Sequence, residues 1–227
     1  MKDVSFSVRR GEIFGIGGLV GAGRSELASL IFGSQQRDSG ELLLDGKRLP
    51  VRSPREAIKS GICLITEDRK QFALFFDRAA QENVVIVKNE MERGPLLNHK
   101  EENLIMDGMI QQLQIVLANR EQPVSTLSGG NQQKTVIARW LLNNCDVYIF
   151  DEPTKGVDVG ARAEIYKLIT NLAKEGKCVI MISSDMPELL SMSDRIGVMR
   201  DGTLTCVLPG KTSEEELLKC FLGVNET

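Results

Sequence analysis

A glycine-rich segment near the start of the chain has the residues of a phosphate-binding loop. Residues 18–25 read GLVGAGRS and stand between a short apolar run and a stretch with helical periodicity. Glycines let backbone N–H groups turn toward an anion, and a helix that begins there adds the positive end of its dipole. The pattern G-x-x-x-x-G-K-[ST] fits except that Arg24 replaces the lysine. The segment predicts phosphate binding, although such turns also precede helices for purely structural reasons.

Two adjacent carboxylates, Asp151 and Glu152, follow the apolar run VYIF at 147–150. Ligands of open α/β sheets bind at the carboxyl ends of parallel strands. Asp151 is therefore a candidate for holding Mg²⁺, and Glu152 for polarising an attacking water. The alternative is a solvated turn after a core strand. A phosphate loop on the same sheet favours the functional interpretation.

A third segment, LSGGNQQK at 127–134, stands just before an amphipathic stretch. Ser128 and the two glycines after it leave N–H groups free at a helix start, which makes a second anion site. The alternative is a plain helix cap. A phosphate loop, this octapeptide and a strand that ends in Asp-Glu are unlikely to occur in this order by chance.

Short apolar runs that alternate with helical stretches predict the elements that position these residues. Buried strands of this kind indicate an α/β core with a mainly parallel sheet. From about 78 to 143 strand runs are absent, which predicts an inserted helical subdomain. Asp-Gly pairs predict hairpin turns at 45–46 and 201–202. The expected strands are 4–8, 13–18, 62–65, 147–150, 178–182 and 196–199, and the expected helices are 25–32, 53–60, 99–117, 131–143, 160–175, 186–191 and 213–221.

The composition is that of a folded domain without general affinity for nucleic acid. The 227 residues are 42% hydrophobic, and 28 basic against 31 acidic side chains give a formal net charge of −3. This charge gives no broad attraction to nucleic acid or anionic membrane. No apolar run reaches the roughly 18–20 residues that span a bilayer. Five cysteines without C-x-x-C spacing indicate buried thiols in a reducing compartment. We therefore expect a soluble, cytoplasmic chain.

Taken together, these segments resemble those of the ATP-binding-cassette ATPases, over nearly the whole chain. Residues 18–25 match the family's phosphate loop, 127–133 its signature and 147–152 its magnesium strand. More narrowly, the chain is similar to the second, C-terminal cassette of the tandem ATPases of bacterial sugar importers for ribose, galactose, xylose and arabinose. The phrases that carry this likeness are GLVGAGRSEL, ITEDRK, LSGGNQQK, DEPTKGVDVGAR and SSDMPEL.

The resemblance implies a P-loop NTPase fold with an antiparallel β edge, in a single nucleotide-binding domain spanning 1–227. Its core would comprise about 1–77 and 144–227, and the signature subdomain about 78–143. The implied ligands are ATP and Mg²⁺, with the metal on Ser25 and Asp151. The implied catalytic residues are Glu152, Glu67 and Ser184, and the implied dimer loop contains Gly156 and Asp158. The implied nucleotide-binding residues are Gly18, Gly21, Ala22, Gly23, Arg24, Ser25 and Glu26, and the implied signature residues are Leu127, Ser128, Gly129, Gly130, Asn131, Gln132 and Gln133.

Four positions depart from the general cassette pattern. Arg24 replaces lysine, Glu26 a hydroxyl residue, Glu67 the glutamine that senses Mg²⁺ and water, and Ser184 the switch histidine. A planar guanidinium does not substitute for an ammonium, and serine lacks an imidazole donor. Each such contact is worth roughly 10²–10³ in rate. We therefore expect a degenerate site that is weakly active or inactive, although Glu152 is retained. All four departures are usual in the C-terminal cassettes of the sugar importers, so they support that resemblance.

The resemblance also implies partners. The chain would donate its signature to a second cassette, on an N-terminal half or another chain, and dock on a membrane permease on the inner face of the cell membrane. A sugar-binding protein would act indirectly. The family's N-terminal edge strand and adenine-stacking loop are expected to be missing, which suggests a fragment, half of a split tandem protein, or weak nucleotide binding. The alternatives are a self-sufficient homodimeric ATPase, a non-transport cassette, a cassette for another solute, and a structural partner that binds no nucleotide.

Overall fold

The computed structural model describes residues 1–92 and 99–224, and the chain divides into two compact units. Unit 1 carries the β-sheet, and unit 2 is helical. Unit 2 contains the described part of the stretch expected to be helical, together with 65–77 and 154–165. Unit 1 comprises 1–64, 145–153 and 166–227, and unit 2 comprises 65–144 and 154–165.

The described residues of unit 1 are built on a six-stranded sheet with the order β4-β5-β6-β1-β7-β8. The strand β1 pairs in parallel with β6 and with β7, and β5 pairs in parallel with β6. The strand β8 pairs with β7 in antiparallel direction at the edge of this sheet, so the expected antiparallel edge is confirmed. The strands are β1 (Ile13–Gly18), β4 (Ile62–Ile65), β5 (Val147–Asp151), β6 (Cys178–Ile182), β7 (Arg195–Arg200) and β8 (Thr203–Pro209).

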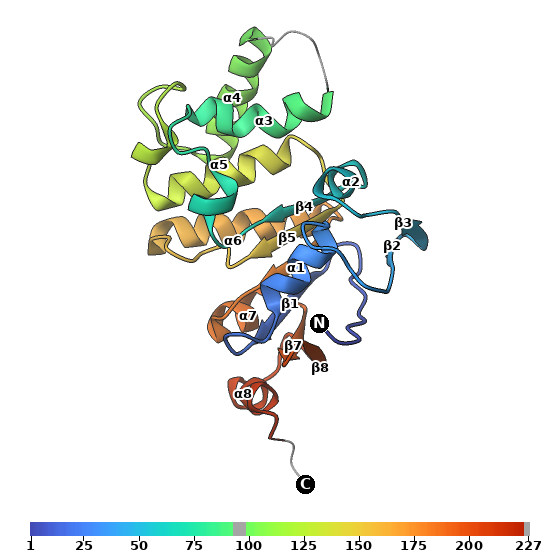
Figure 1. Cartoon of the computed structure of the whole chain (residues 1–227). Helices are drawn as coiled ribbons and strands as arrows, with labels where there is room; N and C mark the ends of the chain where they lie inside the picture. Colours follow the sequence, from blue (N-terminus) through green and yellow to red (C-terminus); the bar gives the residue numbers. More distant parts are fainter. Residues whose placement is uncertain (93–98, 225–227) are drawn as a thin grey trace. The chain divides into compact units, whose positions relative to one another are not determined.

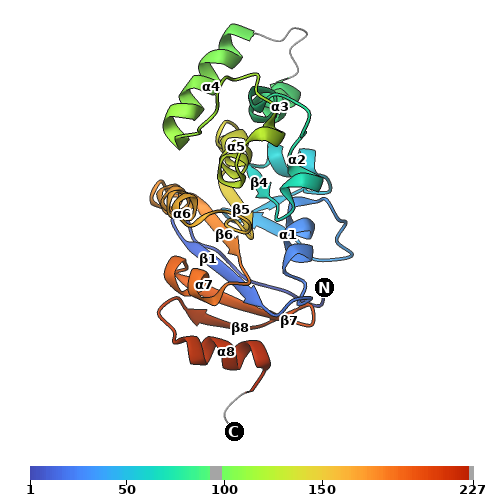
Figure 2. The ribbon, with the colours of Figure 1, turned by 90° about the vertical axis from the view of Figure 1, so that its left-hand side faces the viewer.

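Helices cover both faces of this sheet, with α1 (Arg24–Phe32) on one face and α7 (Met186–Met192) on the other (Figure 2). Every residue of β1 is buried, as expected for a central parallel strand. A Cβ at Gly17 would lie 2.7 Å from Leu189 of α7 and 2.6 Å from Phe221 of α8 (Glu214–Leu222). Glycine at this position therefore lets the two helices approach the strand closely.

Local turn and cap signals are confirmed. A two-stranded hairpin joins β2 (Leu42–Leu44) to β3 (Lys47–Leu49), and Asp45 and Gly46 both have positive φ, at 50° and 75°. Asp201 and Gly202 repeat this geometry between β7 and β8. Ser53 accepts a hydrogen bond from the backbone N–H of Glu56 at the start of α2 (Pro54–Lys59). These features need only neighbouring residues, so the sequence alone predicts them.

The expected strand at 4–8 is wrong. Its side chains do alternate between half-buried and exposed, and Phe6 stacks on Phe14 with ring centroids 5.2 Å apart. The segment nevertheless forms no strand ladder. A period-two pattern decides which side chains face inward, but it does not supply a neighbouring strand with which to hydrogen-bond.

Unit 2 contains one long helix that was not expected. The helix α3 (Ala80–Glu92) packs on α5 (Gly129–Leu141), with Val84 and Val85 buried (Figure 1). Its β-branched run has weak helix propensity, and packing overrides that preference. The neighbouring α4 (His99–Leu113) ends before the expected 117, and α5 begins at 129 instead of 131.

Three further elements complete unit 2 and its connection to unit 1. A π-helical turn η1 (Arg69–Ala73) and a short 3₁₀ turn η2 (Val124–Thr126) lie in unit 2. The helix α6 (Val159–Lys174) begins in unit 2 and continues into unit 1. Across both described ranges, no helix is long and apolar enough to cross a membrane.

Candidate functional site

The glycine-rich loop of unit 1 connects β1 to α1. Gly18 has φ 152°, and a Cβ there would lie 2.3 Å from the carbonyl oxygen of Met199. Gly23 takes a left-handed conformation as the N-cap of α1, and no side chain caps this helix start. The first N–H groups of α1 are therefore available to an anion, which the helix dipole also favours.

The ends of β5 and β6 lie at the same edge of the sheet as this loop. Ile16 of β1 pairs with Ile182 of β6, and Ile182 pairs with Asp151 of β5, so the three residues form one row across the sheet. The backbone N–H of Glu152 donates to the carbonyl of Ile182 at 2.9 Å. Ser184, which is exposed, follows β6 by two residues. Residues that are far apart in sequence thus meet beside the loop, as the parallel topology predicts.

Arg24 and Glu152 form an ion pair within this part of unit 1. Nη1 of Arg24 lies 3.5 Å from Oε1 of Glu152, and the two side chains are only 11% and 9% exposed. This separation is longer than a normal hydrogen bond. Nη1 is buried without a hydrogen-bond partner in the described structure. The pair balances two buried charges while leaving a strong donor unsatisfied.

These features fit a phosphate group and a magnesium ion. The buried Nη1 of Arg24, the glycine turns and the uncapped start of α1 all suit an anion with several oxygens. Asp151, which is 5% exposed, and the hydroxyl of Ser25 at the first turn of α1 are hard oxygen donors. Within residues 1–92 and 99–224, no group of three or more His, Cys, Asp or Glu side chains is arranged so that it could hold a metal ion. A magnesium ion here would therefore take its other ligands from phosphate and water.

The signature segment begins α5 in unit 2. Ser128 is the N-cap, and its Oγ accepts from the backbone N–H of Asn131 at 3.4 Å and from Nδ2 of Asn131 at 3.0 Å. The buried side chain of Gln132 donates to the carbonyls of Leu127 at 3.1 Å and Val124 at 3.3 Å. Side chains and backbone thus hold the start of this helix in one conformation.

The loop at 156–158 packs directly on the start of α5, within unit 2. A Cβ at Gly129 would lie 2.7 Å from the carbonyl oxygen of Gly156, and a Cβ at Gly130 would lie 2.7 Å from Cβ of Ala161. Oδ1 of Asp158 accepts from the N–H of Ala161 at 3.0 Å. The residues predicted for the signature and for the dimer loop therefore form one close-packed junction.

Glu67 lies in unit 2, whereas the other two catalytic candidates, Glu152 and Ser184, lie in unit 1. Glu67 forms an ion pair with Lys155 of unit 2. The same unit contains Arg69, whose guanidinium contacts Gln133 and the backbone of Lys155. Sequence reasoning assigned no role to Arg69 or Lys155, because a single basic residue in a polar stretch carries no spacing signal.

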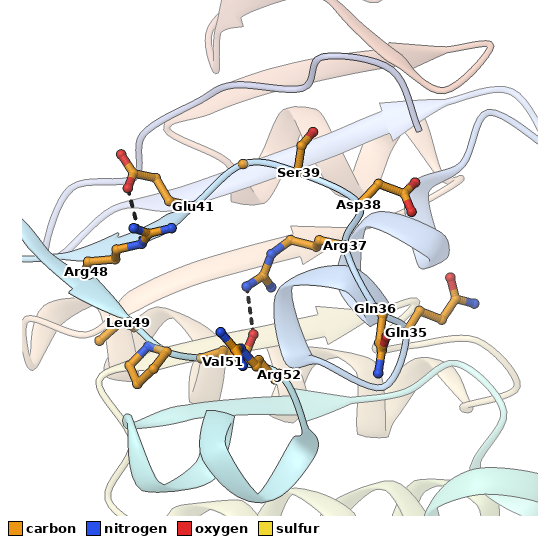
Figure 3. A pocket seen from close by; sticks show the side chains of 12 residues that line it. Gln35, Gln36, Arg37, Asp38, Ser39, Glu41, Arg48, Leu49, Val51 and Arg52 are labelled. Carbon is orange, nitrogen blue, oxygen red and sulfur yellow. Dashed lines mark hydrogen bonds and ion pairs between the residues drawn. The ribbon is translucent and has the colours of Figure 1, made fainter.

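A separate hollow of about 870 Å³ in unit 1 contains none of the predicted site residues (Figure 3). Two of its guanidinium groups are bonded within the protein. Arg37 donates to the carbonyls of Leu30 and Val51 at 2.7 Å each, and Arg48 pairs with Glu41 at 3.4 Å. The contacts of Arg37 tie α1 to the segment after β3, so this guanidinium has a structural role that needs no ligand.

Comparison with known proteins agrees with this geometry. Residues 1–155 match the sequence profile of the family described as ABC transporter. The chain is 45% identical over 221 residues to the ribose import ATP-binding protein RbsA of Oceanobacillus iheyensis, covering 97% of this chain and 45% of that protein. It is 44% identical to a putative ribose/galactose/methyl galactoside import ATP-binding protein of Albidiferax ferrireducens, covering 100% of this chain and 45% of that protein. The chain thus spans less than half the length of these curated relatives.

Solved structures share the fold. A dimeric ATP-binding cassette bound to ADP and Pi in a post-hydrolysis state matches with a TM-score of 0.79 at 22% identity, covering 94% of this chain and 91% of that one. A nucleotide-free ATP-binding cassette from an ABC transporter matches with a TM-score of 0.80 at 23% identity, covering 97% and 87%. The expected cassette fold, a P-loop NTPase with a mostly parallel sheet, is therefore confirmed. Profile, relatives and fold agree that the chain belongs to the ABC transporter family.

Proposed function

We propose that the chain is an ATP-binding cassette that helps to couple the binding and hydrolysis of ATP to the import of a sugar. One observation carries this proposal: the glycine loop, Asp151 and Glu152 meet at one edge of the sheet in unit 1. In this reading the loop binds the phosphates, Ser25 and Asp151 hold Mg²⁺, and Glu152 polarises the attacking water. The names of the relatives, which are ribose and galactose import ATP-binding proteins, support a sugar as the transported solute.

The chain's own site is proposed to bind Mg-ATP and to hydrolyse it slowly. Arg24 is paired with Glu152, so a phosphate must compete with that carboxylate for the guanidinium. Glu26 adds negative charge at the start of α1, where the loop would bind phosphate. Ser184 offers no imidazole, and Glu67 cannot donate as a glutamine amide would. Each missing contact costs roughly 10²–10³ in rate.

The signature would act on a nucleotide held by a second cassette. Ser128, Gly129 and Gly130 begin α5 with N–H groups directed by a rigid cap, which suits a phosphate offered from outside the chain. The relatives are more than twice as long as this chain, which leaves room in them for another cassette. Membrane permease subunits would be the further partners, with a sugar-binding protein acting indirectly. The cassette would then sit on the inner face of the cell membrane through the permease.

A self-sufficient homodimeric ATPase is the second candidate. It is favoured by the retention of Ser25, Asp151 and Glu152 in unit 1 beside a complete signature in unit 2. In that case two copies would close head to tail, each supplying its signature to the other.

Binding of Mg-ATP and release of phosphate by the purified chain separate these candidates, with Glu152→Gln as the control. We expect saturable binding with little turnover that depends on Glu152. Glu152-dependent turnover of about 1 s⁻¹ or more would instead support the homodimeric ATPase. Absence of Mg-ATP binding would contradict both and leave a purely structural partner.

Signature donation is tested in the assembled importer with Ser128→Arg. The long cationic side chain would occupy the space in front of α5 where the second cassette presents its nucleotide. We expect transport-coupled ATPase activity to fall by at least tenfold while Mg-ATP binding to unit 1 is retained. Unchanged activity would show that this signature does not act in trans.

A further inference from the structure

Arg69 lies where three segments of unit 2 meet. It is the first residue of η1, and its Nη1 donates to Oε1 of Gln133 at 3.0 Å and to the carbonyl of Lys155 at 3.2 Å. Gln133 belongs to the signature helix, and Lys155 begins the loop that leads to Gly156. One guanidinium group therefore joins a segment near Glu67 to both elements that the proposed function directs at another cassette.

The start of α5 and the loop at 156–158 are packed so closely that a shift of one would shift the other. Gly129 and Gly156 touch backbone to backbone, since a Cβ on Gly129 would lie 2.7 Å from the carbonyl oxygen of Gly156. Nη2 of Arg69 lies 3.8 Å from that Cβ position and 3.4 Å from the corresponding position at Gly156. The guanidinium therefore lies against both glycines at once.

The bond from Arg69 satisfies one of the two polar atoms of a buried amide. The Gln133 side chain is 1% exposed, and its Nε2 has no hydrogen-bond partner among the described residues. Burial also lowers the pKa of Arg69 from its ordinary value. A buried amide left half satisfied is less favourable than an apolar side chain of the same shape. Without Arg69 the buried Gln133 amide would lose this bond as well, so the removal of Arg69 should disturb the start of α5.

The segment that carries Arg69 is itself held at both ends. Oδ1 of Asp68 accepts from the N–H groups of Lys70 and Gln71 at 3.0 Å each, which caps η1. At the other end the buried guanidinium of Arg139 in α5 donates to the carbonyl of Ala73. With both ends fixed, Arg69 has little freedom to move away from its two acceptors.

We propose that Arg69 is a positioning residue that holds the signature start and the 155–158 loop in a fixed position relative to each other, which we call their register. Its Nη1 group donates to both acceptors at once, and the planar guanidinium also places Nη2 against the two glycines, which a lysine ammonium does not reproduce. The inference rests on the proposed function for its consequence, because the two elements matter together only if they meet a second cassette. The register itself belongs to this chain and needs no ligand to be observed.

Hydrogen exchange of the purified full chain tests the register directly. In Arg69→Gln we expect amides of 128–134 and of 155–161 to exchange about tenfold faster, and by similar factors. Amides of 18–27 in unit 1 should be unchanged. Arg78→Gln is the matched control, because Arg78 lies in the same unit and its guanidinium forms an exposed pair with Glu82 at 3.1 Å. Arg69→Lys should slow exchange in both peptides only part of the way back to wild type, because an ammonium lacks the planar group that lies against the two glycines.

Two outcomes overturn the inference. Unchanged exchange at both peptides would show that Arg69 does not position them. Equal acceleration across all of unit 2 would show that it acts only through general stability. Binding of fluorescent mant-ATP with Mg²⁺ is measured in parallel and should stay within twofold of wild type. Failure of the wild-type chain to bind it would contradict the proposed function, while the exchange result would still decide the role of Arg69.

Discussion

The predicted site residues fall into two sets, or halves, one in unit 1 and one in unit 2, and different interactions hold each of them in place. In unit 1 the loop residue Arg24 meets Glu152 through charge, at 3.5 Å and without a hydrogen bond from Nη1. In unit 2 the signature start is held by hydrogen bonds and by glycines in contact: Ser128 and Gln132 are bonded to the chain on either side of the helix start, and Gln133 accepts from the guanidinium of Arg69.

This difference indicates that the halves have different tasks. In a largely buried ion pair, one charged group can exchange its partner for a stronger one. A polyphosphate is a stronger acceptor for a guanidinium than a single carboxylate is. A close-packed helix start whose polar side chains are bonded within the chain has no such alternative, and it is organised before any ligand arrives. Unit 1 is thus suited to respond to a ligand, and unit 2 to present a fixed surface.

The largest effect is expected from a substitution in the glycine loop of unit 1, the half that is suited to respond to a ligand. In Gly18→Ala the new Cβ would lie 2.3 Å from the Met199 carbonyl oxygen, at a φ of 152°. We expect a loss of about 3 kcal/mol in the free energy of unfolding, since backbone cannot yield easily. Urea denaturation measures it. Gly21→Ala is the control, because nothing lies within 4 Å of that Cβ and only the positive φ opposes it. Equal losses in both variants would contradict the steric account.

A somewhat smaller loss in the free energy of unfolding is expected in unit 2, the half that presents a fixed surface. The guanidinium of Arg139 is buried and donates to the carbonyls of Asn83 and Ala73. In Arg139→Leu those acceptors lose their donor, which should cost about 2–3 kcal/mol. The Arg139→Leu variant is compared with Arg120→Leu by thermal unfolding. Arg120→Leu removes an exposed ion pair with Asp107 and should cost less than about 1 kcal/mol. If the two variants melt alike, the idea of a prebuilt unit 2 is wrong.

The exchange of partners at Arg24 is tested by a double-mutant cycle. Glu152→Gln should tighten binding of the non-hydrolysable analogue AMP-PNP about tenfold, because the guanidinium no longer has to leave a carboxylate. That gain should disappear when Arg24 is also replaced by glutamine. Calorimetric titration of the four proteins measures the coupling. A gain that persists without Arg24 would mean that Glu152 acts only by repelling the phosphates.

The smallest effect concerns the cap of the signature helix. Ser128→Ala removes an acceptor that lies at a long 3.4 Å from the backbone N–H of Asn131, so the free energy of unfolding should fall by about 0.5–1 kcal/mol. Ser128→Asp keeps an acceptor and serves as the control, with stability near wild type. A loss above roughly 2 kcal/mol in the alanine variant would show that the cap carries more of the fixed half than its geometry indicates.

Much of the candidate site was predictable because its signals are short in range. The glycine loop, the Asp151–Glu152 pair and the Ser128 cap are each specified by a few consecutive residues, and parallel topology brings the first two to one edge. By contrast, the strand at 4–8 required a partner strand, and α3 required the packing surface of α5. Neither requirement is visible in a window of neighbouring residues.

The sequence by itself therefore determined the family, the α/β alternation, the turns at 45–46 and 201–202, and the residue types available for chemistry. Only the tertiary structure paired Arg24 with Glu152 and placed Arg69 between Gln133 and the backbone of Lys155. The reason is physical. Turns, caps and periodicity depend on torsion angles and bonds within a few residues, whereas an ion pair or a buried donor depends on which distant segments the packed core brings together.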